Sequence, residues 1–154
     1  MLNETIIVDT REQTPWDLEF YGFKSISKKL DFGDYSVVGY EDKIAIERKS
    51  SNTELANNLG KYYKRFLAEM KLMQYCELKI IICEFPKYKL EEYPKNTVLT
   101  KKQKAKATPG YILVDRLNLI EDKFNIKALF FNNRHEAEMK VIEELDAFFT
   151  KHKR

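Results

Sequence analysis

Short runs of apolar residues along the chain predict a set of β-strands. The β-branched run 5–8 predicts a buried strand, and the runs 30–38 and 43–47, joined by a short glycine-containing turn, predict a hairpin. Two further runs, 78–83 and 126–131, predict strands in the second half of the chain. The run 78–83 is almost wholly apolar, so we expect it to lie centrally in the sheet.

Apolar residues repeat at helical spacing in three other segments. Residues 53–75 have apolar positions every three or four residues and predict one long amphipathic helix. A second pattern covers 109–124 and a third covers 135–149. The lysine-rich segment 85–107 has no such period and is predicted to be irregular. The resulting order, β–ββ–α–β–α–β–α, predicts an α/β fold with a mixed β-sheet flanked by helices.

The composition indicates one domain. A chain of 154 residues, 44% of them hydrophobic, can bury a core without disulfides or metals, and we predict a single domain over 1–154. The net charge is only +3, which says little about partners. Cys76 and Cys83 match no zinc or redox spacing and are expected to be reduced thiols. His135 and His152 are the only histidines, which makes a zinc site or a Ser-His-Asp triad hard to assemble.

No targeting signal or membrane segment is visible in the sequence. The N-terminal residues lack the charged and apolar regions of a signal peptide, and the longest apolar runs are far too short to span a membrane. We therefore expect an intracellular protein without a membrane partner, cytoplasmic in a bacterium or phage-infected cell and nuclear in a eukaryote. Gly60-Lys61-Tyr62 lacks the spacing of a phosphate-binding loop, so we expect no nucleotide cofactor.

Three charged residues of the predicted hairpin are candidates for catalysis. Glu47 and Lys49 are two positions apart on one strand and leave the same face, and Asp34 lies on the paired strand or at its edge. Two carboxylates suit Mg²⁺, which prefers oxygen ligands and can activate a bound water. The lysine would orient or deprotonate that water, or neutralise charge on a phosphate. The alternative is a surface ion pair on a hairpin, which would contribute little.

Five short motifs in a fixed order extend this pattern over most of the chain. They are Val8-Asp-x-Arg-Glu12, Gly33-Asp-Tyr35, Ile46-Glu-Arg-Lys49, Arg65-Phe-x-x-Glu69 and Ile80-Ile-Ile-x-Glu84. Together they resemble the nuclease domain of XPF-type structure-specific endonucleases, which is also found in archaeal Hef and in small phage proteins. The resemblance implies a restriction-endonuclease-like fold of the PD-(D/E)XK superfamily and metal-dependent cleavage of DNA, with Mg²⁺ as the cofactor and Mn²⁺ as a substitute.

Site residues follow from the resemblance by position. It implies that Asp34 and Glu47 bind the metal and that Lys49 is the catalytic lysine. Asp9 and Glu12 match further acidic positions of the family near the metal, and Asp9 is expected to be a third metal ligand. The catalytic set is completed by Arg11 and Arg48, which match the family's arginines.

Strand alternation and one departure refine this assignment. Arg48 faces away from Glu47 and Lys49, so bracing the site suits it better than contact with a phosphate. The family motif ends in an aspartate where this chain has Thr53. Either Glu54 substitutes after a shift of one residue, or the position is dispensable. We expect no tandem helix-hairpin-helix module of the kind that the family carries, and structure selectivity, which that module helps supply, is therefore in question.

Two groups of basic residues are expected to bind DNA, because neutralised phosphates supply most of the affinity for it. Each group has the alternative of being ordinary solvated surface. One group lies on one side of the predicted long helix and the other on the loop 85–107. They comprise Lys61, Lys64 and Arg65, and Lys101, Lys102, Lys104 and Lys106.

Aromatic residues leave further alternatives open. Trp16 and Tyr35, near the acidic cluster, either stack on an unpaired base or pack over the site. Phe148 and Phe149 either serve a dimer interface or complete the core.

The family pairs through this domain, so a homodimer or a partner subunit is expected, and the expected substrate is branched or single-strand-containing DNA. The alternative function is a non-catalytic DNA-binding or scaffold subunit, against which the retained acidic residues and lysine argue.

Overall fold

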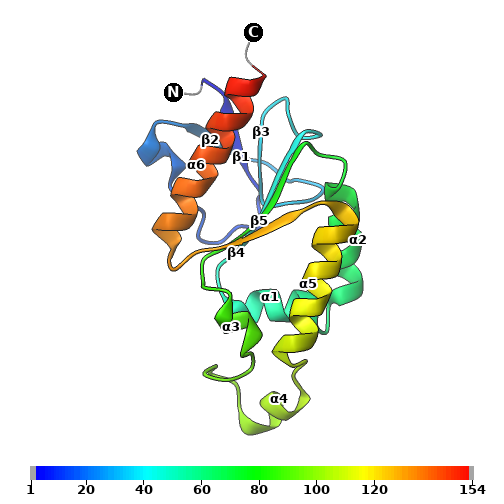
Figure 1. Ribbon diagram of the computed structural model, residues 1–154. Helices are drawn as coiled ribbons and strands as arrows, with labels where there is room; N and C mark the ends of the chain where they lie inside the picture. The colour runs from blue at the N-terminus through cyan, green and yellow to red at the C-terminus, as the bar shows by residue number, and fades with distance from the viewer. Residues whose placement is uncertain (1–2, 153–154) are drawn as a thin grey trace.

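A six-stranded β-sheet with helices on both faces forms the molecule in a computed structural model that describes residues 3–152 (Figure 1). The strands are β1 (Thr5–Val8), β2 (Lys24–Ser27), β3 (Tyr35–Val37), β4 (Ile44–Lys49), β5 (Leu78–Cys83) and β6 (Lys127–Phe130). The helices are a short 3₁₀ helix η1 (Leu18–Tyr21), α1 (Asn52–Leu59), α2 (Tyr63–Met73), α3 (Tyr88–Glu91), α4 (Lys101–Lys106), α5 (Gly110–Phe124) and α6 (Arg134–Lys151). Within the described residues, every helix is too short or too polar to span a lipid bilayer.

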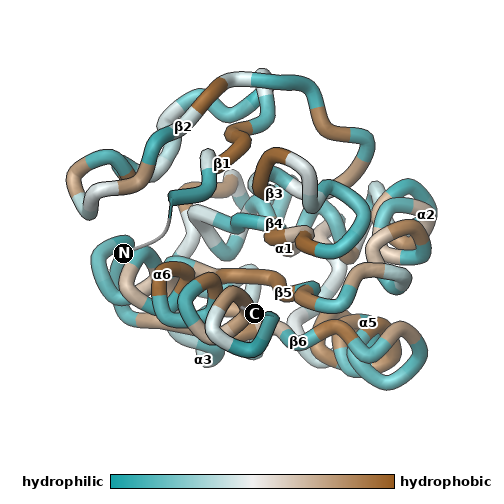
Figure 2. The backbone as a smooth tube through the Cα atoms, turned by 90° about the horizontal axis from the view of Figure 1, so that it is seen from above, coloured by the Kyte–Doolittle hydropathy of each residue, from teal (hydrophilic) through white to brown (hydrophobic). Residues whose placement is uncertain are grey.

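The sheet is mixed, as the sequence predicts, and its strand order is β2-β1-β3-β4-β5-β6. Strand β3 pairs antiparallel with β1 and with β4, while β4, β5 and β6 run parallel, as do β1 and β2. The predicted hairpin is therefore the pair β3 and β4, with Tyr35 opposite Ile46. Strand β5 is internal, and in Figure 2 its tube is largely hydrophobic and passes between α6 and α5.

Two hydrophobic cores lie on opposite faces of the sheet. One core packs α1, α2 and α5 on the sheet, and the other packs α6 on it (Figure 1). The residues of β4 alternate between the two cores: Ala45 belongs to the first, whereas Ile44 and Ile46 belong to the second. By the same alternation, Glu47 and Lys49 point toward α2 and Arg48 points toward α6.

The prediction of one long helix over 53–75 is wrong, because the chain breaks at Gly60 into α1 and α2. The backbone of Gly60 leaves helical geometry, with φ −98° and ψ −106°. A side chain at Gly60 would approach the carbonyl oxygen of Ala56 to 2.8 Å and the hydroxyl of Thr108 to 3.2 Å. Glycine therefore permits a close approach of α1 to the segment before α5, and Lys61 lies in the junction rather than on a continuous helix.

The prediction that 85–107 is irregular is also partly wrong, since this segment contains α3 and α4. Helix α4 buries no residue, so no apolar period marks it. Its N-terminus is fixed by a capping box, in which Thr100 and Gln103 bond each other's backbone N–H groups. Strand β2 is a further element that the sequence does not predict, because its four residues bury no side chain fully.

Candidate functional site

Glu47 and Lys49 form a buried ion pair on the face of β4 that packs against α2. Lys49 Nζ lies 2.6 Å from Glu47 Oε2, and the two residues are 4% and 3% exposed. The ammonium also lies 5.2 Å from the centre of the Phe66 ring on α2. The alternative of a surface ion pair is therefore wrong, because almost no water reaches this pair.

Asp34 lies beside this pair, at the point where the chain enters β3. Its backbone N–H donates to the carbonyl of Ile46 at 2.8 Å, and its Oδ2 accepts from the backbone N–H of Arg48 at 2.7 Å. Gly33 precedes it with φ +74°, and the N–H of Gly33 donates to Glu69 of α2 at 3.1 Å. Two strands and a helix thus place Asp34, Glu47 and Glu69 near enough for their charges to interact.

Burial and mutual repulsion make the carboxylates of this cluster hard to ionise. Burial raises the pKa of Glu47 well above its usual value, and the negative charges of Asp34 and Glu69 add to the effect, against the opposing ammonium of Lys49. Burial likewise raises the pKa of Asp34 to about 7. Burial lowers the pKa of Lys49, but the charges of Glu47 and Asp34 outweigh it, and the net pKa is raised. Lys49 is therefore an ammonium at neutral pH, which makes it a donor rather than a base.

The donor set fits a hard divalent cation. Glu47 Oε1 is completely buried and has no hydrogen-bond partner, which is costly for a carboxylate oxygen. Among residues 3–152, no three His, Cys, Asp or Glu side chains converge into a ready-made metal cluster. Mg²⁺ does not need such a cluster, because it commonly uses one or two carboxylates and keeps several waters. Asp34 and Glu47 could supply two such carboxylates, and a cation between them would offset their repulsion.

Asp9 lies next to Asp34 but is already saturated with hydrogen bonds. The backbone N–H of Asp9 donates to the carbonyl of Asp34 at 2.9 Å. Both oxygens of its carboxylate accept hydrogen bonds, from the side chain and N–H of Arg11 and from the N–H of Leu30. Burial raises the pKa of Asp9, but these bonds outweigh it and the net pKa is lowered. Arg11 itself is 66% exposed beside the cluster, so it remains accessible to a ligand.

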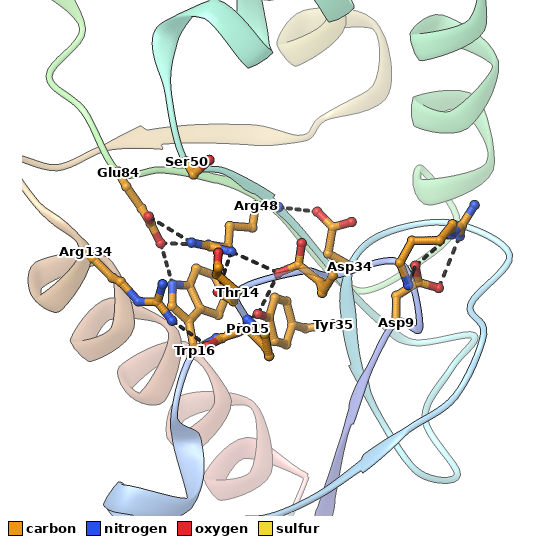
Figure 3. A network of polar contacts seen from close by, with 12 residues as sticks. Asp9, Thr14, Pro15, Trp16, Asp34, Tyr35, Arg48, Ser50, Glu84 and Arg134 are labelled. Atoms are coloured by element: carbon orange, nitrogen blue, oxygen red, sulfur yellow. Dashed lines mark hydrogen bonds and ion pairs between the residues drawn. The ribbon is translucent and has the colours of Figure 1, made fainter.

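Arg48 projects to the opposite face of the sheet, as strand alternation predicts, and joins a buried polar network (Figure 3). Its guanidinium binds Glu84 with two nitrogens, at 2.8 and 3.1 Å, and Glu12 with a third at 3.2 Å. It also donates to the carbonyl of Thr14 at 3.0 Å. The backbone N–H of the same residue binds Asp34, so Arg48 links the network directly to the cluster. Bracing the site is thus the role that its contacts support.

Trp16 and Tyr35 belong to this network and are unavailable to a base. Their rings stack with centroids 4.4 Å apart, and the residues are 3% and 1% exposed. The indole N–H of Trp16 donates to Glu84, and the hydroxyl of Tyr35 donates to Glu12 at 2.7 Å. Of the two alternatives, packing is confirmed and stacking on a base is wrong.

Side chains from α6 complete the network, and no motif or spacing in the sequence predicts their part in it. Arg134 donates to the carbonyl of Pro15, and Glu138 accepts from the N–H of Asp17 at 3.4 Å. Glu69 and Glu84 were present in the motif pattern, but their spacing alone assigned them no role. Their positions are the only sequence signal of a role: Glu84 directly follows an apolar strand, and Glu69 lies within an amphipathic helix.

The remaining predicted residues lie at the surface or in the core. Glu54 lies in the first turn of α1 and accepts from the N–H of Ser50 at 2.9 Å, and whether it substitutes for the family aspartate stays a prediction. Phe148 and Phe149 are 6% and 7% exposed and pack edge-on against Tyr40, so they complete the core and the dimer-interface alternative for them is wrong. The DNA-binding candidates lie apart from the core, on α4 for Lys101, Lys102, Lys104 and Lys106 and around the start of α2 for Lys61, Lys64 and Arg65.

A family model described as the ERCC4 domain matches residues 8–145 of the chain, which includes the carboxylate cluster and the buried network. The chain belongs to the ERCC4 domain family. This membership confirms the resemblance to XPF-type nuclease domains that the five motifs indicate.

Two solved structures of XPF from Aeropyrum pernix have the same fold as this ERCC4 domain. The first matches with a TM-score of 0.63 and 19% identity, and the second, a complex with DNA, with 0.64 and 22%. Each comparison covers 97% of this chain and 66% of the other, so this chain spans about two thirds of the length of these structures. No sequence among functionally curated proteins matches significantly.

Proposed function

We propose that this ERCC4 domain is a Mg²⁺-dependent endodeoxyribonuclease, in which Mn²⁺ can replace Mg²⁺. The proposal rests on one observation above all: Glu47 Oε1 is buried without a partner, beside a second carboxylate, Asp34, whose ionisation is also disfavoured. Such an arrangement is costly unless a cation binds there. Membership of the ERCC4 family and the likeness to an XPF structure solved with DNA support a place among nucleases that act on structured DNA.

The residues divide the work of hydrolysis among them. Asp34 and Glu47 would hold the cation, which when bound supplies an activated water and positive charge beside the scissile phosphate. Lys49 keeps its proton on Nζ, and from there it donates to Glu47 and to an oxygen of the phosphate. The N–H of Arg48 fixes the direction of Asp34, and the packing of Phe66 over Lys49 excludes water from the ion pair.

Asp9 and Glu12 take supporting parts in this proposal. Both carboxylate oxygens of Asp9 accept hydrogen bonds from Arg11 and Leu30. We therefore assign Asp9 to holding the loop after β1 in position, and not to the third metal-ligand position that the resemblance implies. Glu12 holds Arg48 from the opposite face. The exposed Arg11 is assigned to a phosphate of the substrate.

We assign branched or single-strand-containing DNA as the substrate, bound by the lysines of α4 and the cations near the start of α2. These side chains would supply the sequence-independent part of the affinity. A homodimer or a partner subunit would extend the DNA surface beyond this one domain. We place the protein inside the cell and assign it no nucleotide cofactor.

The test is cleavage of labelled branched and linear DNAs with Mg²⁺ or Mn²⁺. The wild type is compared with Asp34→Asn and Lys49→Ala, and circular dichroism checks that each variant is folded. We expect the wild type to cleave DNA and both variants to cleave it at least about a hundredfold more slowly. Binding of DNA without cleavage under either metal would overturn the proposal in favour of a non-catalytic DNA-binding subunit.

A further inference from the structure

Tyr62 is an exposed aromatic residue at the junction between α1 and α2. It is 40% exposed, so part of its ring is open to solvent. The guanidinium carbon of Arg65 lies 4.5 Å from the centre of its ring, and the ammonium of Lys61 lies 5.1 Å from it. The ring is thus held at the surface by two cations instead of being packed into the core.

A hollow opens beside this ring along the outer side of α2. Its volume is about 410 Å³, which is within the range of sites for small ligands or single nucleotides. The short side chain of Ala68, between one and two turns into α2, leaves the space that a longer residue would fill. The residues that line the hollow are Lys61, Tyr62, Lys64, Arg65 and Ala68.

The cations around the hollow are not used by the protein itself. Within residues 3–152, Lys61, Lys64 and Arg65 form no ion pair, whereas the arginines near the carboxylate cluster are all paired. Three positive charges around one exposed ring repel each other, so this surface favours an anionic partner. The exposed ring of Tyr62 among these cations favours a partner that also has a flat apolar face.

The hollow lies close to the proposed catalytic residues. Tyr62 precedes Phe66 by four positions, about one helical turn or roughly 6 Å along α2. Phe66 in turn packs over the ammonium of Lys49. Tyr62 therefore lies about one helical turn from the residue that covers the proposed catalytic lysine.

We propose that an unpaired nucleobase stacks on the pair formed by Tyr62 and Arg65, while Lys61 and Lys64 bind the phosphates on either side of it. This site rests on the proposed function and deepens it, because it assigns a contact that only an unpaired strand can make. Bases within a duplex have both faces covered by their neighbours, whereas an unpaired base offers a free face to an aromatic side chain. The stacking role that the sequence suggested for Trp16 and Tyr35 is thereby taken by Tyr62.

The test measures binding in the absence of divalent metal, so that no DNA is cut. The probes are a labelled single-stranded oligodeoxythymidine and a labelled blunt duplex of the same length, followed by fluorescence anisotropy. Tyr62→Leu removes the ring, Tyr62→Phe keeps it, and Tyr75→Leu is the matched control. Tyr75 is also an exposed tyrosine, 79% exposed, but it follows the far end of α2.

We expect Tyr62→Leu to weaken single-strand binding about tenfold and to change duplex binding less than twofold. Tyr62→Phe and Tyr75→Leu should bind both probes like the wild type. An oligonucleotide carrying 2-aminopurine should lose fluorescence on binding the wild type but not Tyr62→Leu, because stacking quenches this base. Melting temperatures of all variants check that the fold is intact.

Two results would overturn the stacking site: single-strand affinity unchanged in Tyr62→Leu, or an equal loss for both probes. The first would leave the ring without a function in binding, and the second would make it a general support for the basic surface. Neither result touches the cleavage assay, so the nuclease proposal stands or falls separately. Absence of binding to either probe would remove the stacking site together with the DNA-binding part of the proposed function.

Discussion

The ammonium of Lys49 lies 2.6 Å from Oε2 of Glu47, while the other oxygen of the same carboxylate is buried without a partner. One oxygen of this carboxylate is thus paired within the protein, and the other has no partner. Because both residues are almost fully buried, changing either partner alters an interaction that water cannot replace.

Replacing Lys49 with methionine should destabilise the protein in a pH-dependent way. The variant keeps the volume of the side chain but leaves the Glu47 carboxylate unpaired, which costs about 3 kcal/mol at pH 8. The pKa of Glu47 is already raised, so the carboxyl takes up a proton at lower pH and the loss should be smaller at pH 5. Urea unfolding at both pH values measures this.

The double variant Glu47→Gln/Lys49→Met is the control for this experiment. It removes the charge together with its partner, so it should be more stable than Lys49→Met at pH 8. If the single and double variants were equally unstable, a packing defect at Lys49 rather than an unpaired charge would explain the loss.

Asp34→Asn should make the protein more stable at neutral and alkaline pH. The folded-state pKa of Asp34, about 7, lies above its ordinary value of 3.8. The folded state therefore binds this proton more tightly than the unfolded state, so the stability that it contributes is full below about pH 4 and is lost as the pH rises through 7. The amide mimics the protonated form at every pH. We expect a melting temperature a few degrees above wild type at pH 8, roughly 1 kcal/mol, and little difference at pH 4.

The melting temperature in the presence of Mg²⁺ provides a second test of Asp34→Asn. At pH 8, Mg²⁺ should raise the melting temperature of the wild type, since a ligand that binds only the folded state stabilises it. Asp34→Asn should show a much smaller rise. Equal rises in both proteins would mean that the cation binds away from Asp34.

Changes at Glu84 should be visible in the fluorescence of Trp16, the single tryptophan of the chain. Glu84→Ala removes the acceptor of the indole N–H and one partner of Arg48, so we expect a shifted emission maximum and a loss of about 3 kcal/mol. Glu84→Gln keeps an acceptor oxygen and should change the emission less. Glu143→Ala, at an exposed glutamate of α6, is the control and should leave both quantities unchanged.

Removing positive charge from α4 should reduce the salt dependence of DNA binding. In the triple variant Lys101→Gln/Lys102→Gln/Lys104→Gln, the slope of log K against log[salt] should fall by about 2.7 if all three lysines contact phosphates. Affinity should drop similarly for single-stranded and duplex DNA. Lys123→Gln/Lys127→Gln, at the opposite end of α5 from α4, is the control, and an unchanged slope in the triple variant would exclude α4 from the interface.

Much of the fold follows from periodicity, because strands β4 and β5 and helices α5 and α6 bury one face or both. The elements that the sequence did not predict bury little: β2 has no fully buried residue and α4 has none either. At the break between α1 and α2, the backbone of Gly60 passes close to Thr108, which is distant in sequence. Local patterns contain no information about such contacts.

The site was predictable to the extent that strand alternation governs it. The two-residue spacing of Glu47 and Lys49 places them on one face and Arg48 on the other. The partners of Arg48 come from three different parts of the chain, so no spacing rule identifies them. Tyr62 is a similar case, because it falls in the apolar period of the predicted helix 53–75 and yet is 40% exposed just after the break at Gly60.

The loop after β1 is fixed by a helix that comes much later in the chain. Pro15 receives its hydrogen bond from Arg134, 119 positions further on, and Asp17 donates to Glu138 of the same helix. During synthesis, the acidic residues and the lysine of the cluster all leave the ribosome well before α6 does. The nascent chain thus contains every proposed catalytic group long before it can fix the loop beside them, and cleavage activity should arise only when the closing helix has docked.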